Sequence, residues 1–244
     1  MASPLSTLDR EPTRSVLARL HAKARGDRWK FVGLLPRLAA GWARGRSFSE
    51  IVTPEAMKDV FIPVSAEQGR LLYLTARAIG ARTLVEFGTS FGISTIYLAA
   101  ALADNGGGRV FGSEIEAGKH ARAQEHLAEA GLAGLAEVRL GDARETLATV
   151  PGPVDLVLLD GWKDLYLPVL GLLEPKLRPG AVVLADNIFT FRKDLRPYVE
   201  HVQSGEHGFV STTLRISDGF EYSVYVGAGG AAVSPASTSS QKRP

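Results

Sequence analysis

Two stretches decide the fold: Val154-Asp-Leu-Val-Leu-Leu-Asp160-Gly-Trp-Lys163 and Ala181-Val-Val-Leu-Ala-Asp186-Asn187. Each begins as an apolar run of the kind that parallel sheets bury on both faces, and each ends in acidic or amide side chains. Because the carboxyl ends of the strands line the ligand crevice in an open α/β sheet, we expect Asp160, Asp186 and Asn187 to converge there. Three oxygen ligands beside the amine of Lys163 predict a divalent-metal site with a base.

Strands and helices alternate through the middle of the chain, which predicts a doubly wound, mostly parallel α/β sheet. The predicted strands are Thr83–Phe87, Arg109–Ser113, Ala136–Leu140, Val154–Leu159 and Ala181–Ala185. The predicted helices cover residues 92–103, 117–130, 144–149, 163–177 and 195–203. Two further strands, 210–216 and 220–226, flank Asp218-Gly219 and predict a hairpin, so the sheet should end with antiparallel pairing.

The first sixty residues predict a helical extension. Helical spacing covers residues 13–25 and 27–44, with interruptions expected at Gly26 and Pro36. Pro63 then breaks the chain, and Ser65 with Gln68 fits a capping box that opens a helix running to about Ile79. We therefore expect an N-terminal helical cap at 1–60, a main domain at 61–227, and a disordered tail rich in Gly, Ala and Ser at 228–244.

Composition excludes several classes of protein. The 244 residues contain no cysteine, which excludes disulfides, thiol catalysis and cysteine-ligated zinc. The N-terminus lacks the apolar core of a secretory signal and no apolar stretch reaches membrane-spanning length, so we expect a soluble, cytoplasmic protein without a membrane partner.

The net charge of +2 hides an asymmetry, because residues 10–46 carry ten Lys or Arg against only Glu11 and Asp27. We expect this basic arm to lie on the acidic remainder of its own chain or of a second subunit. No nucleic-acid motif accompanies it, so we predict no nucleic-acid partner.

A glycine turn joins the first predicted strand to its helix: Leu84-Val-Glu86-Phe-Gly88-Thr-Ser90-Phe-Gly92-Ile-Ser94. Close backbone approach and a helix N-terminus favour an anionic or polar ligand at such a turn. The turn has two glycines where the dinucleotide fingerprint needs three. It also matches the nucleophile elbow of α/β-hydrolases at Ser90, but no upstream strand or oxyanion loop is visible before Glu86, which disfavours a hydrolase.

Acidic side chains at three successive strand ends favour another ligand. Glu86 precedes the turn, Glu114 ends the next strand where an acid of this topology binds a ribose, and Asp142 ends the third, where it could meet an adenine edge. Because three carboxylates would repel phosphates, the pattern predicts a nucleoside ligand without phosphates. S-adenosylmethionine fits, since it carries ribose, adenine and a cationic sulfonium.

Together these motifs resemble the metal-dependent O-methyltransferases of the catechol and caffeoyl-CoA type, which use S-adenosylmethionine. The resemblance runs from about Ile62 to Val226 and is densest in 159–168 and 180–187. It implies a class I methyltransferase domain at 61–227 with a seven-stranded sheet, S-adenosylmethionine and Mg²⁺ (or another divalent cation) as cofactors, and methyl transfer to a hydroxyl of a small, aromatic acceptor. The implied cofactor contacts are Val64, Glu86, Gly88, Thr89, Ser94, Glu114, Asp142, Ala143 and Asp160.

The resemblance also assigns the catalytic residues. It implies Asp160, Asp186 and Asn187 as Mg²⁺ ligands and Lys163 as the base, acting beside Asp160. The acceptor would be bordered by Trp162, Lys163 and Asn187. Members of the family often form dimers, so a homodimer is expected, and the aromatic residues Trp29, Phe31 and Trp42 of the N-terminal helices could build its interface or a substrate lid.

The chain departs from the catechol enzymes at two positions. Gly161 stands where they have a histidine, and Thr212, within Ser211-Thr-Thr213, is the nearest match to a glutamate that contacts the second catechol hydroxyl. Two alternatives therefore stay open: a metal-independent N- or C-methyltransferase acting on a small molecule, and a non-catalytic adenosyl-binding module whose basic helices dock a partner.

Overall fold

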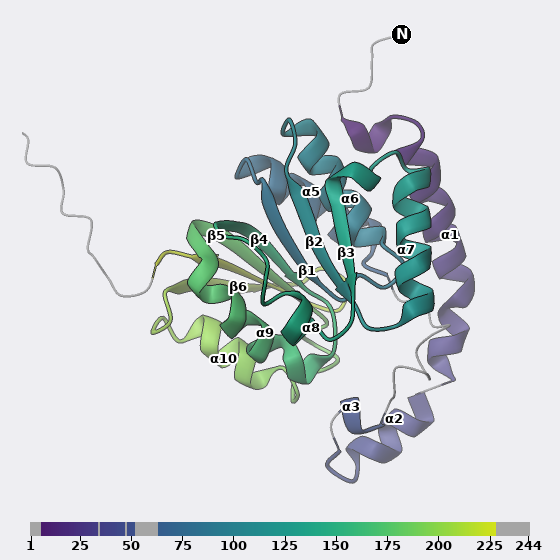
Figure 1. The fold of residues 1–244 in the computed structure, drawn as a ribbon. Helices are drawn as coiled ribbons and strands as arrows, with labels where there is room; N and C mark the ends of the chain where they lie inside the picture. The colour runs from purple at the N-terminus through teal and green to yellow at the C-terminus, as the bar shows by residue number, and fades with distance from the viewer. Residues whose placement is uncertain (1–5, 34, 47, 52–62, 228–244) are drawn as a thin grey trace, which may run out of the picture.

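The computed structural model describes residues 6–33, 35–46, 48–51 and 63–227 (Figure 1). The expected disordered tail at 228–244 and the side chains of Trp29 and Phe31 lie outside the described residues. Among the residues described, no helix is both long enough and apolar enough to traverse a lipid bilayer.

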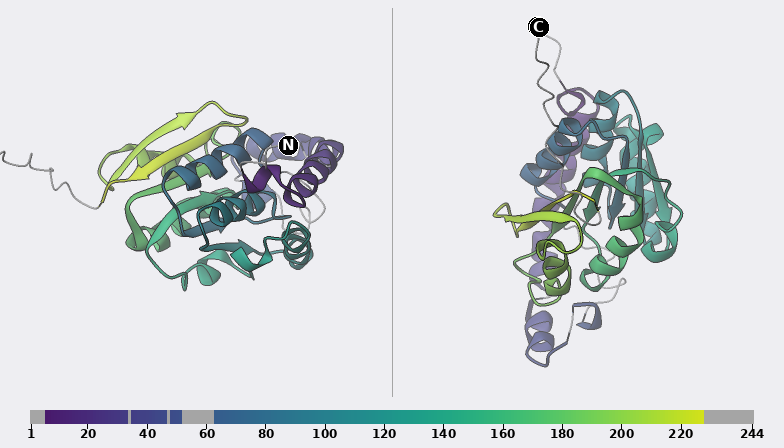
Figure 2. Two further views of the ribbon diagram at one scale, coloured as in Figure 1. Left: turned by 90° about the horizontal axis from the view of Figure 1, so that it is seen from above. Right: turned by 90° about the vertical axis from the view of Figure 1, so that its left-hand side faces the viewer.

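A seven-stranded sheet forms the centre of the molecule, in the order β3-β2-β1-β4-β5-β7-β6. Its strands are β1 (Thr83–Phe87), β2 (Arg109–Glu114), β3 (Ala136–Leu140), β4 (Val154–Leu159), β5 (Leu177–Asp186), β6 (Phe209–Leu214) and β7 (Phe220–Tyr225). The first five pair in parallel, and β7 runs antiparallel to both β5 and β6. The predicted doubly wound sheet with an antiparallel C-terminal hairpin is confirmed, and Figure 2 shows that hairpin extending from one edge. The strand order reverses between β1 and β4, which is where such sheets bind ligands.

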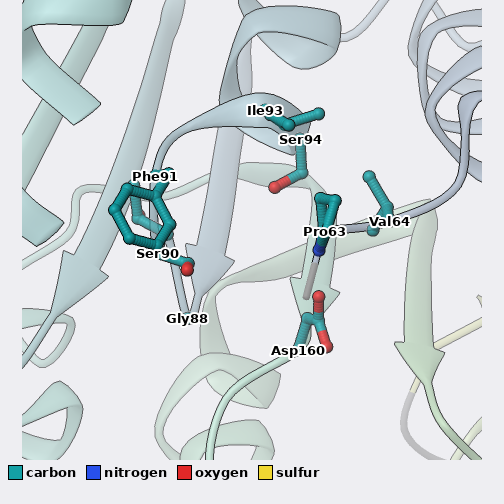
Figure 3. A pocket seen from close by; sticks show the side chains of 9 residues that line it. Pro63, Val64, Gly88, Ser90, Phe91, Ile93, Ser94 and Asp160 are labelled. Atoms are coloured by element: carbon teal, nitrogen blue, oxygen red, sulfur yellow. The ribbon is translucent and has the colours of Figure 1, made fainter. Parts of the chain in front are cut away.

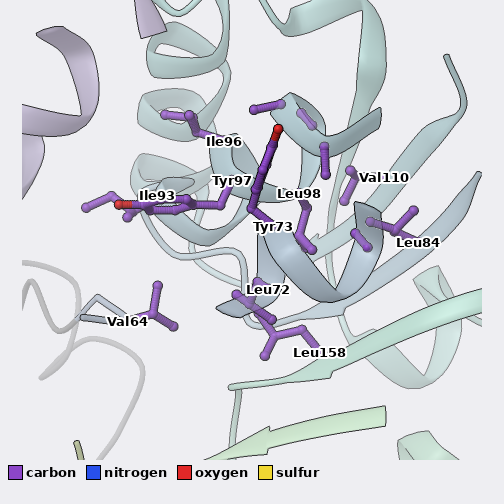
Figure 4. Close-up of a cluster of buried hydrophobic side chains, with 14 of the residues drawn as sticks. Val64, Leu72, Tyr73, Leu84, Ile93, Ile96, Tyr97, Leu98, Val110 and Leu158 are labelled. Carbon is purple, nitrogen blue, oxygen red and sulfur yellow. The ribbon is translucent and has the colours of Figure 1, made fainter. Parts of the chain in front are cut away.

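Helices cover both faces of the sheet. They are α5 (Ala66–Ala78), α6 (Ile93–Asp104) and α7 (Ala117–Glu129) on one face, and α8 (Ala143–Thr146), α9 (Tyr166–Leu173) and α10 (Arg196–Gln203) on the other. Short 3₁₀ turns are η2 (Ala133–Leu135), η3 (Lys163–Leu165) and η4 (Glu174–Lys176). Alternate residues of β5 point to opposite faces, so Val182 and Leu184 enter the apolar cluster shown in part in Figure 4, whereas Val183 and Ala185 enter the second cluster.

The N-terminal elements are η1 (Thr7–Asp9), α1 (Thr13–Val32), α2 (Leu35–Trp42) and α3 (Phe48–Ile51). Thr7 binds the carboxylate of Asp104 at the end of α6, and Arg19 of α1 pairs with Glu129 of α7. The basic arm therefore lies on its own chain, which is one of the two arrangements that the sequence predicted. From this start α1 runs along the body so that α2 and α3 lie beyond the carboxyl ends of the strands (Figure 1).

The helices outside the sheet differ from the prediction in some places and agree in others. Helix α1 continues through Gly26, because one glycine costs a packed helix only about 1 kcal/mol. The break expected at Pro36 is present, because α1 ends at Val32 and α2 begins at Leu35; Pro36 itself lies in the first turn of α2, where its missing N–H is no loss. The helix predicted for 163–177 is divided into η3, α9 and η4, and Pro175 stands where η4 replaces the α-helix.

Candidate active site

The carboxyl ends of β4 and β5 bring the predicted metal ligands and the predicted base together. Leu159 pairs with Ala185, so Asp160 and Asp186 leave the sheet side by side. The ammonium Nζ of Lys163 donates to Asn187 Oδ1 at 2.7 Å and lies 3.6 Å from Asp160 Oδ1. Asn187 adopts a left-handed backbone (φ +66°), a conformation that asparagine tolerates better than most residues. This turn directs its amide oxygen toward the lysine.

Lys163 is buried among hydrogen-bonding and aromatic groups. Only 6% of the residue is exposed, and Nζ donates to the Tyr166 hydroxyl at 2.7 Å. The rings of Tyr166 and Phe191 lie 4.9 and 5.4 Å from Nζ. Burial lowers the pKa of Lys163, although the charges of Asp160 and Asp186 oppose that shift. The neutral amine is thus more accessible than on a surface lysine, as a general base requires.

A helix cap holds the second carboxylate in place. The predicted capping box of α5 is confirmed, with Gln68 Oε1 accepting from Ser65 N at 2.8 Å. The other end of the same amide, Nε2, donates to Asp186 Oδ1 at 2.7 Å. Because the cap orients the amide, the N-terminus of α5 also positions Asp186.

The donor set fits a hard divalent cation. Burial raises the pKa of Asp160 well above its usual value, and the nearby charge of Asp186 adds to the effect. The buried carboxylate of Asp186, the largely buried carboxylate of Asp160 and an amide oxygen beside the ammonium of Lys163 are an arrangement that a divalent ion would stabilise. Within the described ranges no three His, Cys, Asp or Glu side chains gather to hold a metal, so any site here depends on the amide of Asn187 as third ligand.

A small cleft adjoins these residues and shares Asp160 with them (Figure 3). It is lined by Pro63, Val64, Gly88, Thr89, Ser90, Phe91, Ile93, Ser94 and Asp160. Gly88 has φ +96°, and a Cβ there would lie 2.5 Å from the backbone oxygen of Asp160. Only glycine therefore allows the glycine turn and the Asp160 turn to touch, and both contribute to one cleft.

Two of the predicted cofactor acids accept hydrogen bonds from groups of the protein itself, Glu86 from side-chain hydroxyls and Glu114 from backbone amides. Glu86 is fully buried, and its Oε2 accepts from the hydroxyls of Thr89 and Thr95 at 2.9 and 2.6 Å. Its Oε1 has no hydrogen-bond partner among the described residues, and burial raises the pKa of the carboxyl. This carboxylate oxygen of Glu86 lies beneath the turn without a partner, which fits a ligand that donates a hydrogen bond to it. Glu114, 8% exposed, accepts from Ser90 N at 2.7 Å, which fixes the same turn.

The third acid is neutralised locally. Asp142 caps α8, and its carboxylate accepts from the guanidinium of Arg144 at 2.6 Å. That hydrogen bond lowers the pKa of Asp142. The neighbouring Ala143 is 5% exposed. The expectation of three free acids repelling phosphate is therefore weakened at this position.

The structure explains the glycine at position 161 and shows that Thr212 lies away from the predicted metal ligands. A Cβ at Gly161 would lie 2.4 Å from the ring of Phe87, so that ring occupies the space of a side chain at 161. Thr212 is exposed in the middle of the edge strand β6, paired with Tyr222, away from the strand ends that carry Asp186. Trp162 is half-buried and packs against the second apolar cluster.

Sequence reasoning missed four side chains around Lys163 and Asp186. They are Gln68, Tyr166, Phe191 and Asp218. Gln68 was visible only as a cap and Asp218 only as a turn residue. Tyr166 lies one helical turn after Lys163, a spacing that could have identified it. Phe191 is also in edge contact with Trp42 of α2, at 6.2 Å between ring centroids, which joins the N-terminal helices to the site.

Comparisons with known proteins identify a family and several relatives of this chain. A family profile described as a methyltransferase domain matches residues 85–188. The catechol O-methyltransferase of Mycobacterium tuberculosis is 42% identical over 129 residues, which are 52% of this chain and 57% of that protein. The catechol O-methyltransferase of Bos taurus is 32% identical over 186 residues, 72% of this chain and 68% of that protein. The chain thus spans little more than half the length of the mycobacterial relative it matches.

A solved structure shares the fold. The O-methyltransferase TomG from Streptomyces achromogenes, involved in tomaymycin synthesis and solved in complex with S-adenosylmethionine, has a TM-score of 0.65 and 32% identity. The match covers 69% of this chain and 84% of that one. The seven-stranded sheet is accordingly that of the class I methyltransferases.

Proposed function

Because this chain belongs to the family of S-adenosylmethionine-dependent O-methyltransferases of the catechol O-methyltransferase type, we propose that it transfers a methyl group from S-adenosylmethionine to a hydroxyl of a small aromatic acceptor. Mg²⁺ assists the transfer and Lys163 acts as the base in this proposal. The expected homodimer and cytoplasmic location stay predictions.

One observation supports the proposal above the others: the glycine turn and Asp160 line a single cleft. The same Asp160 lies 3.6 Å from Lys163 Nζ, which in turn binds Asn187. A donor held by the glycine turn would therefore have its reactive end beside the lysine and the carboxylates. Methyl transfer needs this proximity, because acceptor oxygen, methyl carbon and sulfur must lie in line.

The residues of the site have separate tasks. A carbon–oxygen bond forms as the carbon–sulfur bond breaks, giving a methyl ether and S-adenosylhomocysteine, and the hydroxyl proton passes to the neutral Nζ of Lys163. Tyr166 and Asn187 hold Nζ at the crevice, and Phe191 covers it from water. Asp160, Asp186 and Asn187 would hold Mg²⁺. When bound, Mg²⁺ lowers the pKa of the acceptor hydroxyl and orients it.

The test is methyl transfer from S-adenosylmethionine to catechol by the purified protein, in excess chelator and after addition of Mg²⁺. We expect turnover only with Mg²⁺. Lys163→Met should lower kcat about 100- to 10,000-fold, the range of general acid–base catalysis, while leaving S-adenosylhomocysteine affinity within about threefold of wild type because the glycine turn is intact. Lys193→Met, at an exposed lysine, is the matched control and should behave as wild type.

Each part of the proposal can fail separately. Transfer to no hydroxylated aromatic would refute the activity. Full turnover in excess chelator would remove the metal and favour a metal-independent reaction. Unchanged kcat in Lys163→Met would remove the base. Asp186→Ala should abolish turnover but keep S-adenosylhomocysteine binding, and loss of both would mean that Asp186 supports the cleft itself.

A further inference from the structure

The two edges of the sheet carry different side chains. Strand β3 ends the sheet on one side and contains Glu137 and Arg139, which pair with each other at 2.7 Å. Strand β6 ends it on the other side and reads Phe-Val-Ser-Thr-Thr-Leu, without a charged residue or a proline. Its register with β7 is unbroken, and Figure 2 shows their hairpin at the margin of the molecule. Edge strands that stay alone are usually protected by charged side chains, proline or a bulge, so the β6 edge is open to another strand.

The register of the hairpin shows which main-chain groups of β6 are free. Val226 N donates to Gly208 O at 2.7 Å, so these two residues form a hydrogen-bonded pair. Such pairs alternate along an antiparallel ladder, which means that the even-numbered residues of β6 bond to β7. The N–H and C=O groups of Phe209, Ser211 and Thr213 therefore point toward the open edge. Among the residues that the structure describes, no other group binds them there.

The side chains along this edge suit contact with another strand. Val210 is 65% exposed and Thr212 is exposed, and both point to the same face of the hairpin because they are two residues apart. On the opposite face the buried carboxylate of Glu221 accepts from the hydroxyls of Ser211 and Thr213, so its hydrogen bonds are made inside the hairpin. A strand laid along β6 would thus meet apolar and hydroxyl groups rather than a charge.

We propose that the β6 edge binds the same edge of a second copy of this chain, antiparallel and about a twofold axis at Ser211. That axis places Ser211 opposite its own copy and Val210 opposite Thr212 of the other copy. Every outward main-chain group over Phe209–Thr213 then gains a partner, because antiparallel strands exchange hydrogen bonds at alternate residues. Main-chain hydrogen bonds of this kind supply the affinity when one strand is added to the edge of a sheet.

The charges at the two ends of β6 favour a second copy as the partner. Glu206 lies in the loop before the strand and Arg215 follows the strand. Both side chains are exposed, and neither forms an ion pair in the part of the chain that the structure describes. An antiparallel copy reverses the direction of the strand, which sets Arg215 of one copy beside the loop that carries Glu206 in the other. Opposite charges therefore meet at both ends of the paired strands.

Two double variants test this register. In the opposite-charge variant, Val210→Glu/Thr212→Lys, each acidic side chain faces a basic one of the other copy, whereas in the like-charge variant, Val210→Lys/Thr212→Lys, ammonium faces ammonium. We expect sedimentation velocity to show a dimer for wild type and for the opposite-charge variant. The dissociation constant of the like-charge variant should be about tenfold to hundredfold higher than that of the opposite-charge variant. Leu74→Lys, at an exposed leucine of α5, is the control and should dimerise as wild type does.

Amide hydrogen exchange of β6 is a second measurement and needs no variant. The outward N–H groups of Ser211 and Thr213 should exchange more slowly as the wild-type protein is concentrated, because pairing protects them. A wild-type protein that stays monomeric, exchange that does not depend on concentration, or a dimer that the two double variants weaken equally would overturn the proposal. Dissociation by Leu74→Lys as large as by the like-charge variant would do the same, since the copies would then meet through another face. None of these readouts involves methyl transfer, so they are independent of the proposed function.

Discussion

The amide of Gln68 closes the helix cap with its oxygen and donates to Asp186 with its nitrogen, and the replacement Gln68→Glu changes only the second contact. A glutamate can still close the capping box through its oxygen, because Glu and Gln serve equally at that position. It cannot donate to Asp186 Oδ1 unless it is protonated. The substitution therefore leaves the N-terminus of α5 intact and changes only the contact that positions the second carboxylate.

The magnitude follows from the geometry. Two unit charges at the observed 2.7 Å repel by about 6 kcal/mol at an effective dielectric constant of about 20. Keeping the introduced carboxyl protonated costs about 1.4 kcal/mol for each pH unit above about 4.3, or about 4 kcal/mol at pH 7. Protonation is the cheaper outcome at neutral pH, so it sets the upper limit of the destabilisation.

The folded pKa of the introduced carboxyl decides whether the stability of Gln68→Glu rises or falls with pH. The introduced carboxyl has a folded pKa above its unfolded value, so it leaves stability unchanged below about pH 4.3, where its proton restores the hydrogen bond to Asp186. That stability is lost as pH rises toward the folded pKa. The difference in unfolding free energy between wild type and Gln68→Glu should widen by up to about 1.4 kcal/mol per pH unit.

Urea denaturation of both proteins in excess chelator, from pH 4.5 to 7.5, measures this difference. Ser65→Ala is the control, because it removes the cap alone and should cost about 0.5–2 kcal/mol without a pH trend. A penalty for Gln68→Glu that stays constant across the range would refute the reasoning. It would show that the amide of Gln68 does not bear on the carboxylate of Asp186 in solution.

Two further predictions concern stability away from this contact. Burial raises the pKa of Asp155, but hydrogen bonds from Arg178 and two backbone amides lower it overall; its stabilisation is present above about pH 4 and lost as pH falls. Asp155→Asn should therefore cost about 2–3 kcal/mol at pH 7 and less below pH 4, with kcat unchanged, and denaturation at both pH values checks it. Gly161→Ala should lower stability by about 1–3 kcal/mol through collision with the Phe87 ring. Adding Phe87→Leu should recover most of that loss in a double-mutant cycle, and strict additivity would contradict the contact.

The sequence predicts the bounds of three strands, since β1, β3 and β4 have the predicted ones. Strands β1 and β4 are almost wholly buried, so each is a short apolar run between turn residues, whereas β3 is a partly buried strand at the edge of the sheet. The convergence of Asp160, Asp186 and Asn187 follows from the same property, since parallel strands that leave the core at one edge bring their next residues together. Topology alone therefore predicts that part of the site.

Partners that come from distant segments could not be predicted. The amide of Gln68 reaches Asp186 across 118 positions of sequence, and no local pattern reports such a contact. Asp142 matched the position of an adenine contact, yet Arg144 two residues later takes its carboxylate. A pattern says which side chains gather at an edge of the sheet. It does not say which of them already satisfy one another.

The arrangement around Lys163 explains why the unpredicted partners matter for chemistry. Burial lowers the pKa of Lys163 and raises the pKa of Asp160, so the site disfavours the charged form of both groups. Such a cluster persists only if the surroundings over-determine its geometry. Tyr166, which accepts from Lys163, and Gln68, which donates to the neighbouring Asp186, supply that restraint, and both lie at the start of a helix. The residues that the sequence did not predict are therefore the ones that keep an electrostatically unfavourable site ordered.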